Sequence, residues 1–223
     1  MTVTVTPLTP HIGAEISGLD LSADLSPENR ALLRQAWLDH IVILVRDQKL
    51  DDQALIRFAG CFGDVATLAR PKAFRTKGQI DFDDRIMLIS NIRENGEPIG
   101  ALPDGEMMFH HDMIHAHLPD NASVLYAVEI PSHGGNTLFA SGYAAYDTLP
   151  DDVREPLEGR MGFHHYNYGT THRGGTNGTE AFSEATHPVF RTHDETGRKA
   201  IYVNRLMTEG IVDMARDQSD VLL

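Results

Sequence analysis

The sequence predicts a mainly β domain with flanking helices, of the β-sandwich or jelly-roll kind. Two helical stretches come early, and many short strand-like runs separated by turn residues follow them. That order is typical of a β-sandwich or jelly roll whose helices lie outside. The chain has 223 residues, enough for one large domain, and we expect residues 1–223 to form a single domain.

The two helices are predicted from their capping residues and apolar spacing. In residues 26–40, Ser26 is a suitable N-cap and Pro27 suits the first helical position. One apolar stripe follows, made of Leu32, Leu33, Ala36 and Trp37. Residues 41–45 then read as a buried strand, and a second helix is expected from Asp51 to Gly63.

The remainder of the chain predicts short strands and loops. Strands are expected at 86–90, 123–130, 137–141 and 159–169, with two helical pieces over 141–158 and loops at 64–85 and 171–185. A hairpin is predicted where residues 188–193 and 199–204 flank the turn sequence DETGR. The strand over 123–130 has the strongest pattern of these.

Composition and charge exclude several classes of function. The formal net charge is −13, which argues against binding to nucleic acid or to an anionic membrane surface. No apolar run is long enough to span a bilayer, and the first ten residues lack the pattern of a signal peptide. Cys61 is the only cysteine and lies in an apolar stretch, which fits a packed thiol and a cytoplasmic protein.

Histidine is the unusual residue of this chain. Of the twelve His residues, nine cluster in 110–117, 164–172 and 187–193. In the first cluster His110 and Asp112 stand two residues apart, so on an extended segment they point to the same side. A His-x-carboxylate pair supplies two thirds of the facial triad of non-haem Fe(II) oxygenases. The spacing alone is a weak signal, because it is common by chance.

Several separate motifs place that pair in context. They are, in chain order, IGAEISGLDL at 12–21, VRDQ at 45–48, FHHD at 109–112, PSHGGNT at 131–137, HPVFRTH at 187–193, GRKA at 197–200 and YVNR at 202–205. Together they resemble the TauD/TfdA family, the taurine and aryloxyalkanoate dioxygenases that depend on 2-oxoglutarate. The resemblance runs from about residue 8 to the end of the chain.

The resemblance implies a chemistry and roles for three residues. His110 and Asp112 match the first two Fe(II) ligands, and Thr137 matches the threonine that binds a 2-oxoglutarate carboxylate. The implied reaction uses O₂ to hydroxylate a small, anionic organic substrate and releases succinate and CO₂; homo-oligomers also occur among such relatives. Phe109 and Asn136 replace the family's usual Trp and Asp, which leaves the metal pair unchanged.

One departure concerns the end of the chain. The family's third iron ligand is a distant His, followed by an Arg that pairs with 2-oxoglutarate, and no His follows His193 here. The resemblance therefore predicts a C-terminally truncated jelly roll without its closing strands, and leaves open that the chain alone is inactive. The alternative is that His172, His187 or His193 supplies the third ligand.

Two other functions stay open at this point. The His111-Asp112 doublet is also found in metal-dependent phosphohydrolases, although those enzymes are helical. The chain could also be a catalytically incomplete fragment or a binding module on the same fold. For the other His residues we expect packed or surface roles: His111 turned away from the pair, His115 and His117 sharing one face, and at most one of His164 and His165 in a pocket. The basic residues Arg70, Lys72, Arg75 and Lys77 are candidates for steering an anion.

Overall fold

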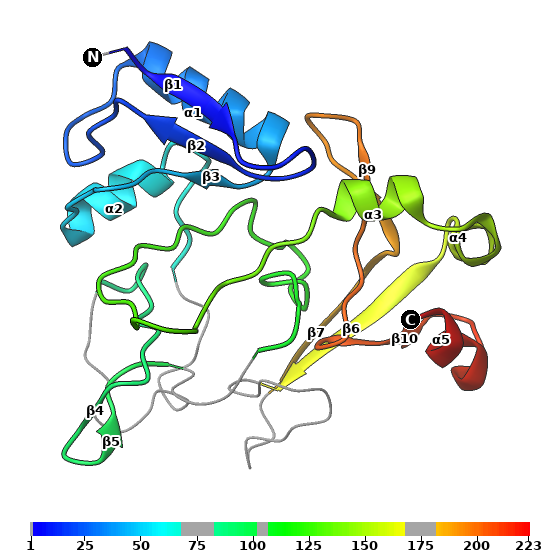
Figure 1. Cartoon of the computed structure of the whole chain (residues 1–223). Helices are drawn as coiled ribbons and strands as arrows, with labels where there is room; N and C mark the ends of the chain where they lie inside the picture. Colours follow the sequence, from blue (N-terminus) through cyan, green and yellow to red (C-terminus); the bar gives the residue numbers. More distant parts are fainter. Residues whose placement is uncertain (1, 68–82, 102–106, 168–181) are drawn as a thin grey trace. The chain divides into compact units, whose positions relative to one another are not determined.

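The computed structural model describes residues 2–67, 83–101, 107–167 and 182–223 (Figure 1). This part of the chain contains ten strands and five helices and divides into two compact units. The first unit combines Met1–Val65 with Asn121–Ala144, and the second combines Ala66–Asp120 with Ala145–Leu223. Each unit is thus assembled from two separate stretches of sequence.

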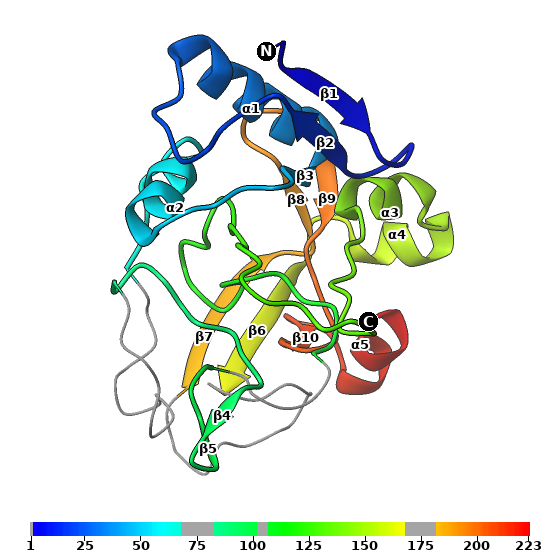
Figure 2. The same cartoon turned by 60° about the vertical axis from the view of Figure 1, so that its left-hand side comes forward.

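The first unit contains a three-stranded sheet in the order β1-β2-β3. β1 (Thr4–Pro7) pairs antiparallel with β2 (Ala14–Ser17), and β2 pairs parallel with β3 (Ile43–Leu44). Helix α1 (Pro27–His40) lies along one face of this sheet, as the two cartoon views show (Figure 2). The sheet and the helix bury one apolar core between them, centred on Ile16, Leu33, Ala36 and Phe62.

The caps of both early helices are the predicted ones. The hydroxyl of Ser26 accepts a hydrogen bond from the backbone N–H of Asn29 at 3.2 Å, and the helix begins at Pro27. The carboxylate of Asp51 likewise accepts from the N–H of Ala54 at 2.8 Å at the start of α2 (Asp52–Ala59). That helix ends at Ala59, with Gly60 as its C-cap, and not at the expected Gly63. Beyond it, the N–H groups of Cys61 and Phe62 bond to the carbonyls of Phe58 and Ala59, three positions earlier, and no longer continue the α-helix.

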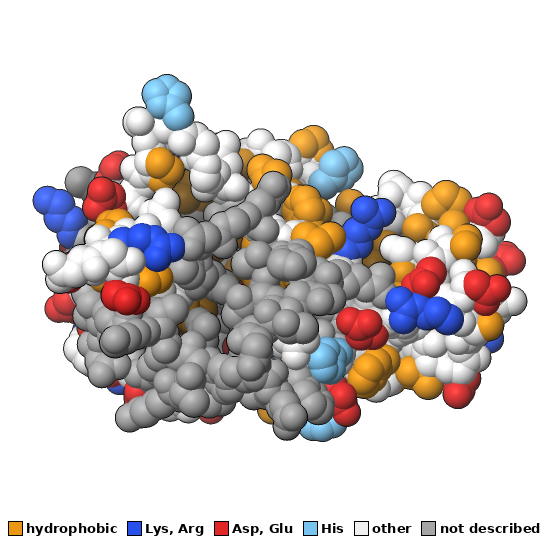
Figure 3. Space-filling model, turned by 90° about the horizontal axis from the view of Figure 1, so that it is seen from below, with side chains coloured by type: hydrophobic (Ala, Val, Ile, Leu, Met, Phe, Trp, Pro, Cys, Tyr) orange, Lys and Arg blue, Asp and Glu red, His pale blue; other side chains and the backbone are white. Residues whose placement is uncertain are grey.

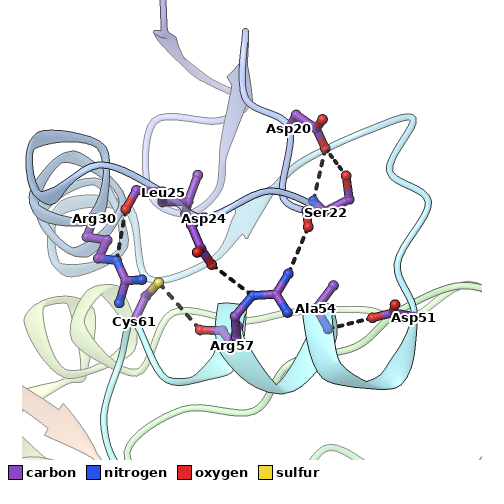
Figure 4. A network of polar contacts seen from close by, with 9 residues as sticks. All are labelled: Asp20, Ser22, Asp24, Leu25, Arg30, Asp51, Ala54, Arg57 and Cys61. Carbon is purple, nitrogen blue, oxygen red and sulfur yellow. Dashed lines mark hydrogen bonds and ion pairs between the residues drawn. The ribbon is translucent and has the colours of Figure 1, made fainter.

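Arg57 joins α2 to the loop before α1 (Figure 4). Its guanidinium donates to the carbonyl of Ser22 at 2.8 Å and lies 3.1 Å from Asp24. The thiol of Cys61 contacts the carbonyl of Arg57 at 3.8 Å, and burial raises the pKa of that thiol. Cys61 is therefore a packed, protonated side chain, as its apolar surroundings in the sequence suggest.

The second unit is built on the sheet β10-β6-β7. β6 (Met161–Asn167) and β7 (Phe182–Pro188) pair antiparallel over their full length, from Met161 opposite Pro188 to Asn167 opposite Phe182. β10 (Thr208–Ile211) pairs antiparallel with the other edge of β6, with an irregularity between Thr208 and Gly210. Gly162 permits close packing here, because a Cβ at that position would lie 3.2 Å from the His164 ring and from Val203.

Smaller elements surround this sheet. They are the hairpins β4 (Arg93–Glu94) with β5 (Glu97–Pro98) and β8 (Phe190–Thr192) with β9 (Lys199–Ile201), and the helices α3 (Gly142–Thr148), α4 (Asp151–Leu157) and α5 (Arg216–Leu222). The β8–β9 hairpin and the two helical pieces match the sequence prediction. A core of Leu157, Val189, Phe190 and Ile211 packs beneath them.

Several predicted strands are wrong. Residues 123–130 and 137–141 form no strand, and 86–90 contributes only a single bridge between Ile89 and Ala101. Large apolar side chains of 123–130 are exposed instead, with Leu125 at 69%, Val128 at 82% and Ile130 at 75%. An alternating apolar pattern makes a strand only where another backbone supplies the ladder, and no strand of the described residues pairs with this one.

The sequence prediction also missed elements. β1, β2 and α5 were not expected, and the predicted loop at 171–185 becomes part of β7 from Phe182 onward. The sheets of the described residues form no closed barrel, so the jelly-roll arrangement stays a prediction.

Hydrophobic side chains reach the surface among charged ones on the face drawn in Figure 3. In the described part of the chain, no helix has the length and apolar character needed to cross a bilayer.

Candidate metal site

His110 and Asp112 meet at one point in the second unit. The Nε2 atom of His110 lies 3.1 Å from Oδ1 of Asp112, and the two side chains are 25% and 55% exposed. On its other side, the His110 ring donates from Nδ1 to the carbonyl of Met108 at 2.8 Å. The hydrogen bond with Asp112 raises the pKa of His110. The pair is thus within reach of solvent, and its imidazole is held by the backbone.

This geometry fits a metal ion. Because Nδ1 carries the proton donated to Met108, the neutral ring presents a lone pair at Nε2 to the Asp112 carboxylate. Two electron-rich atoms this close require a shared proton or a cation between them. Two donors at right angles, each about 2.1 Å from one ion, lie about 3 Å apart, close to the separation of this pair.

The pair does not lie on an extended segment throughout. Residues 112–115 form a turn, in which Met113 has a φ of 56° and the N–H of Ile114 bonds to the carbonyl of His111 at 3.4 Å. The expectation of an extended chain is therefore wrong after Asp112. The two side chains nevertheless converge, which is the contact that their spacing predicts.

His111 is packed, as expected, and has different neighbours from His110. Its ring centroid lies 4.9 Å from that of Tyr202, and its Nδ1 accepts a hydrogen bond from the Asn204 amide at 3.4 Å. Burial, and secondly the neighbouring charge of His110, lowers the pKa of His111. His111 is therefore a packed side chain held by Tyr202 and Asn204.

His115 and His117 do not share a face, contrary to expectation. His115 is buried and its ring stacks on Tyr166 at 5.0 Å, whereas His117 is exposed. The turn at 112–115 breaks the two-residue alternation on which the expectation depended.

A second group of packed rings comes from β6 and β7. His164 is fully buried, bonds through Nδ1 to the Thr208 hydroxyl at 3.1 Å, and lies 5.7 Å from His187 between ring centroids. Burial, then the charges of His187 and His111, lowers the pKa of His164 to about 4. His165 is only half-buried, so one of the two adjacent residues points inward, as expected.

Among the described residues, two side chains, those of His110 and Asp112, form the candidate metal site. Among them, no group of three or more His, Cys, Asp or Glu residues could hold a metal ion. His187 donates to the carbonyl of Ala116, and Nδ1 of His193 accepts from the N–H groups of Glu195 and Thr196. Of the alternatives considered for a third ligand, His187 and His193 are therefore engaged elsewhere, and His172 lies outside the described residues.

Thr137 lies in the first unit, on an exposed stretch without helix or strand. Its role in binding 2-oxoglutarate stays a prediction. The basic residues Arg70, Lys72, Arg75 and Lys77, and most of the 171–185 stretch, lie outside the described residues.

The family model described as "Taurine catabolism dioxygenase TauD, TfdA family" matches residues 4–223. The chain belongs to the TauD/TfdA family. Pentalenolactone F synthase of Streptomyces avermitilis is 32% identical over 222 residues, an alignment that covers 91% of this chain and 71% of that protein. An alpha-ketoglutarate-dependent sulfate ester dioxygenase of Pseudomonas putida is 29% identical over 225 residues, covering 94% and 70%.

Solved structures agree with this family membership. A taurine dioxygenase from Burkholderia xenovorans superimposes with a TM-score of 0.75 at 27% identity, covering 99% of this chain and 69% of the other. The structure of AAD-2 in complex with Mn(II) and N-oxalylglycine gives a TM-score of 0.73 at 25% identity and covers 100% and 77%. The TauD/TfdA family predicted from seven short motifs is thus confirmed along nearly the whole chain.

Proposed function

We propose that this member of the TauD/TfdA family is an Fe(II)- and 2-oxoglutarate-dependent dioxygenase that hydroxylates a small anionic organic molecule. The observation that carries the proposal is the 3.1 Å approach of His110 Nε2 to Asp112 Oδ1, on the sequence FHHD, in a chain of this family. The substrate class is supported by relatives named for (S)-phenoxypropionate, 2,4-dichlorophenoxyacetate and sulfate esters, all of which are anions near neutral pH.

His110 and Asp112 would hold the metal, and Thr137 would bind a carboxylate of 2-oxoglutarate. The Met108 carbonyl fixes the His110 ring with its Nε2 lone pair toward the ion. Iron held there would activate O₂, so that one oxygen atom would enter succinate as 2-oxoglutarate loses CO₂ and the other would become the product hydroxyl. Because both side chains of the pair are partly exposed, the small molecules could reach a metal held there.

The test is a screen for succinate release with sulfonates, aryloxyalkanoates, sulfate esters and amino-acid derivatives as substrates. We expect turnover that requires Fe(II), 2-oxoglutarate and O₂ together, and that is lost in His110→Ala. His117→Ala is the matched control, because it removes an exposed His close to the pair in the same stretch. Succinate release that survives in His110→Ala would overturn the assignment of the metal pair.

The alternative functions would give no succinate and would be detected by other measurements. A phosphohydrolase would show metal-dependent phosphatase activity without 2-oxoglutarate, and a binding module would bind a ligand without turnover. The two members of the His111-Asp112 doublet, which suggested a phosphohydrolase, have different partners. His111 packs against Tyr202, whereas Asp112 meets His110. A cytoplasmic location and a homo-oligomeric state remain parts of the proposal.

A further inference from the structure

The residues around the metal pair lack the backbone ladder that fixes most sites on a sheet. Residues 107–117, the His110 segment, contain turns and irregular backbone, and no strand of the described residues pairs with them. The position of the pair therefore depends on side chains that reach the segment from other elements. Several such contacts come from β7 and from the stretch after β9.

His187 holds the far end of the segment. This buried side chain on β7 donates from Nε2 to the carbonyl of Ala116 at 2.8 Å. Its ring is enclosed by His164 and Tyr202, whose centroids lie 5.7 and 5.6 Å away. From the same strand, the hydroxyl of Ser183 donates to the carbonyl of His115 at 3.1 Å. A donor held so firmly fixes where the chain runs after Asp112.

Asn204 holds the segment at His111. Its Oδ1 accepts hydrogen bonds from the backbone N–H groups of Leu206 at 3.1 Å and Met207 at 2.8 Å. Since these bonds fix which end of the amide is oxygen, Nδ2 is the atom that faces His111 Nδ1 at 3.4 Å. The backbone N–H of Asn204 also donates to the Thr208 hydroxyl at 2.9 Å, which ties this turn to the start of β10.

We propose that His187 and Asn204 are positioning residues for the metal site, and that they keep His110 and Asp112 at a common point. Asn204 holds the His110 segment at His111, between the two members of the pair, and His187 holds it at Ala116, beyond Asp112. The inference rests on the proposed function, since it assigns the purpose of these contacts to metal binding. Neither residue contacts the metal pair directly in the contacts described here; each acts through the backbone or ring of a neighbour.

The first test measures metal affinity with Mn(II), a redox-inert probe followed by its electron paramagnetic resonance signal. We expect His187→Leu and Asn204→Ser each to raise the Mn(II) dissociation constant by roughly tenfold, the lower end of the range for losing an outer-shell partner. Ser at 204 retains an oxygen for the turn but cannot reach His111. His187→Gln retains an N–H donor and should recover most of the loss.

His193→Leu is the control, because His193 lies in the β8–β9 turn, where its Nδ1 accepts hydrogen bonds from the N–H groups of Glu195 and Thr196. Its Mn(II) affinity should equal that of the wild type. A merely structural role for His187 would lower the unfolding temperature and leave the Mn(II) affinity of the folded protein unchanged, and that result would overturn the inference. Should His187→Leu fail to fold, His187→Gln and Asn204→Ser give the same comparison.

The second test does not depend on metal. Hydrogen exchange of the backbone amides of residues 111–116 should become about tenfold faster in Asn204→Ser and His187→Leu than in the wild type or His193→Leu. Unchanged exchange would refute the positioning role whatever the metal data show. If the wild type bound no Mn(II) while exchange still became faster in the variants, the proposed function would be wrong. His187 and Asn204 would still be shown to hold the His110 segment in place.

Discussion

The N-terminal layer of the first unit and the His110 segment of the second are fixed by different kinds of bond. In the layer, the β1-β2-β3 ladder and α1 enclose a continuous apolar core around Leu33. In the His110 segment, single hydrogen bonds from His187, Ser183 and Asn204 replace the ladder. The layer distributes its stability over the ladder and its core. The His110 segment has a smaller core, in which Ile114 packs with Leu206 and Met207, and the hydrogen bonds fix how its chain runs around the pair.

Because the two regions are held differently, we expect substitutions in them to affect different properties: folding stability in the layer and metal binding at the pair. Removing a core side chain from the layer should cost folding free energy, while removing a side chain at the metal pair should cost binding and little else. The exposure of the two sites supports this division, since Leu33 is fully buried and Asp112 is 55% exposed.

The largest effect is expected for Asp112→Ala. We expect Fe(II) affinity to fall by more than about 100-fold, beyond the usual loss for an outer-shell partner, because one of the two proposed protein ligands disappears. The free energy of unfolding of the metal-free protein should change by less than about 0.5 kcal/mol, as for other exposed positions. Anaerobic Fe(II) titration and urea unfolding measure the two quantities. A large loss of stability in Asp112→Ala would show that the metal pair also contributes to folding, contrary to the contrast drawn above.

Leu33→Ala is the reverse experiment. We expect the free energy of unfolding to fall by about 3 kcal/mol, since the change leaves a cavity in a fully buried site between α1 and the sheet. Gln35→Ala, on the exposed side of the same helix, is the matched control and should change stability by less than about 0.5 kcal/mol. Equal losses in both variants would mean that the layer is not the cooperative core that its packing indicates.

The same contrast explains how much of the molecule could be predicted from sequence. Ser26 with Pro27, and Asp51, act on backbone groups within three residues, so the starts of α1 and α2 could be predicted locally. The turn sequence DETGR likewise carries its own hairpin. His110 and Asp112 could be found because they stand only two positions apart and the surrounding motifs give the family.

Features that depend on distant partners could not be predicted. The segment 123–130 has the apolar alternation of a strand, but its ladder partner is not encoded within it, and Leu125 and Val128 are exposed. The contacts of His187 with Ala116 and of Asn204 with His111 join residues 71 and 93 positions apart. Neither residue has a local signal in the sequence that would assign it to the metal site.

Acid should destabilise the second unit through His164. Its folded-state pKa of about 4 lies below the ordinary His value near 6.5, because the ring is buried against His187, His111 and Tyr202 and its Nε2 has no hydrogen-bond partner among the described residues. The unfolded chain therefore binds the extra proton first, and stability falls as the pH drops from about 6.5 toward 4. Between pH 7 and 5 this residue should cost about 2 kcal/mol.

Urea unfolding of the wild type and of His164→Gln at pH 7, 6 and 5 isolates that contribution. On acidification from pH 7 to pH 5, the wild type should lose about 2 kcal/mol of unfolding free energy relative to His164→Gln, since Gln does not titrate. A difference independent of pH would show that His164 is protonated in the folded state and that the buried ring cluster is not neutral.

The smallest effect, and the one that tests the role proposed for the first unit, is expected for Thr137→Val. If its hydroxyl binds a carboxylate of 2-oxoglutarate, the affinity should fall by about 1 kcal/mol, or somewhat more because the acceptor is charged. Thr137→Ser retains the hydroxyl and should bind 2-oxoglutarate nearly as well as the wild type. Thr137 is exposed and outside any helix or strand, so neither change should affect folding by more than about 0.5 kcal/mol. Calorimetric titration of 2-oxoglutarate in the presence of Mn(II) gives the affinities. Equal affinity in Thr137→Val and the wild type would remove Thr137 from the site and confine the candidate functional residues to the second unit.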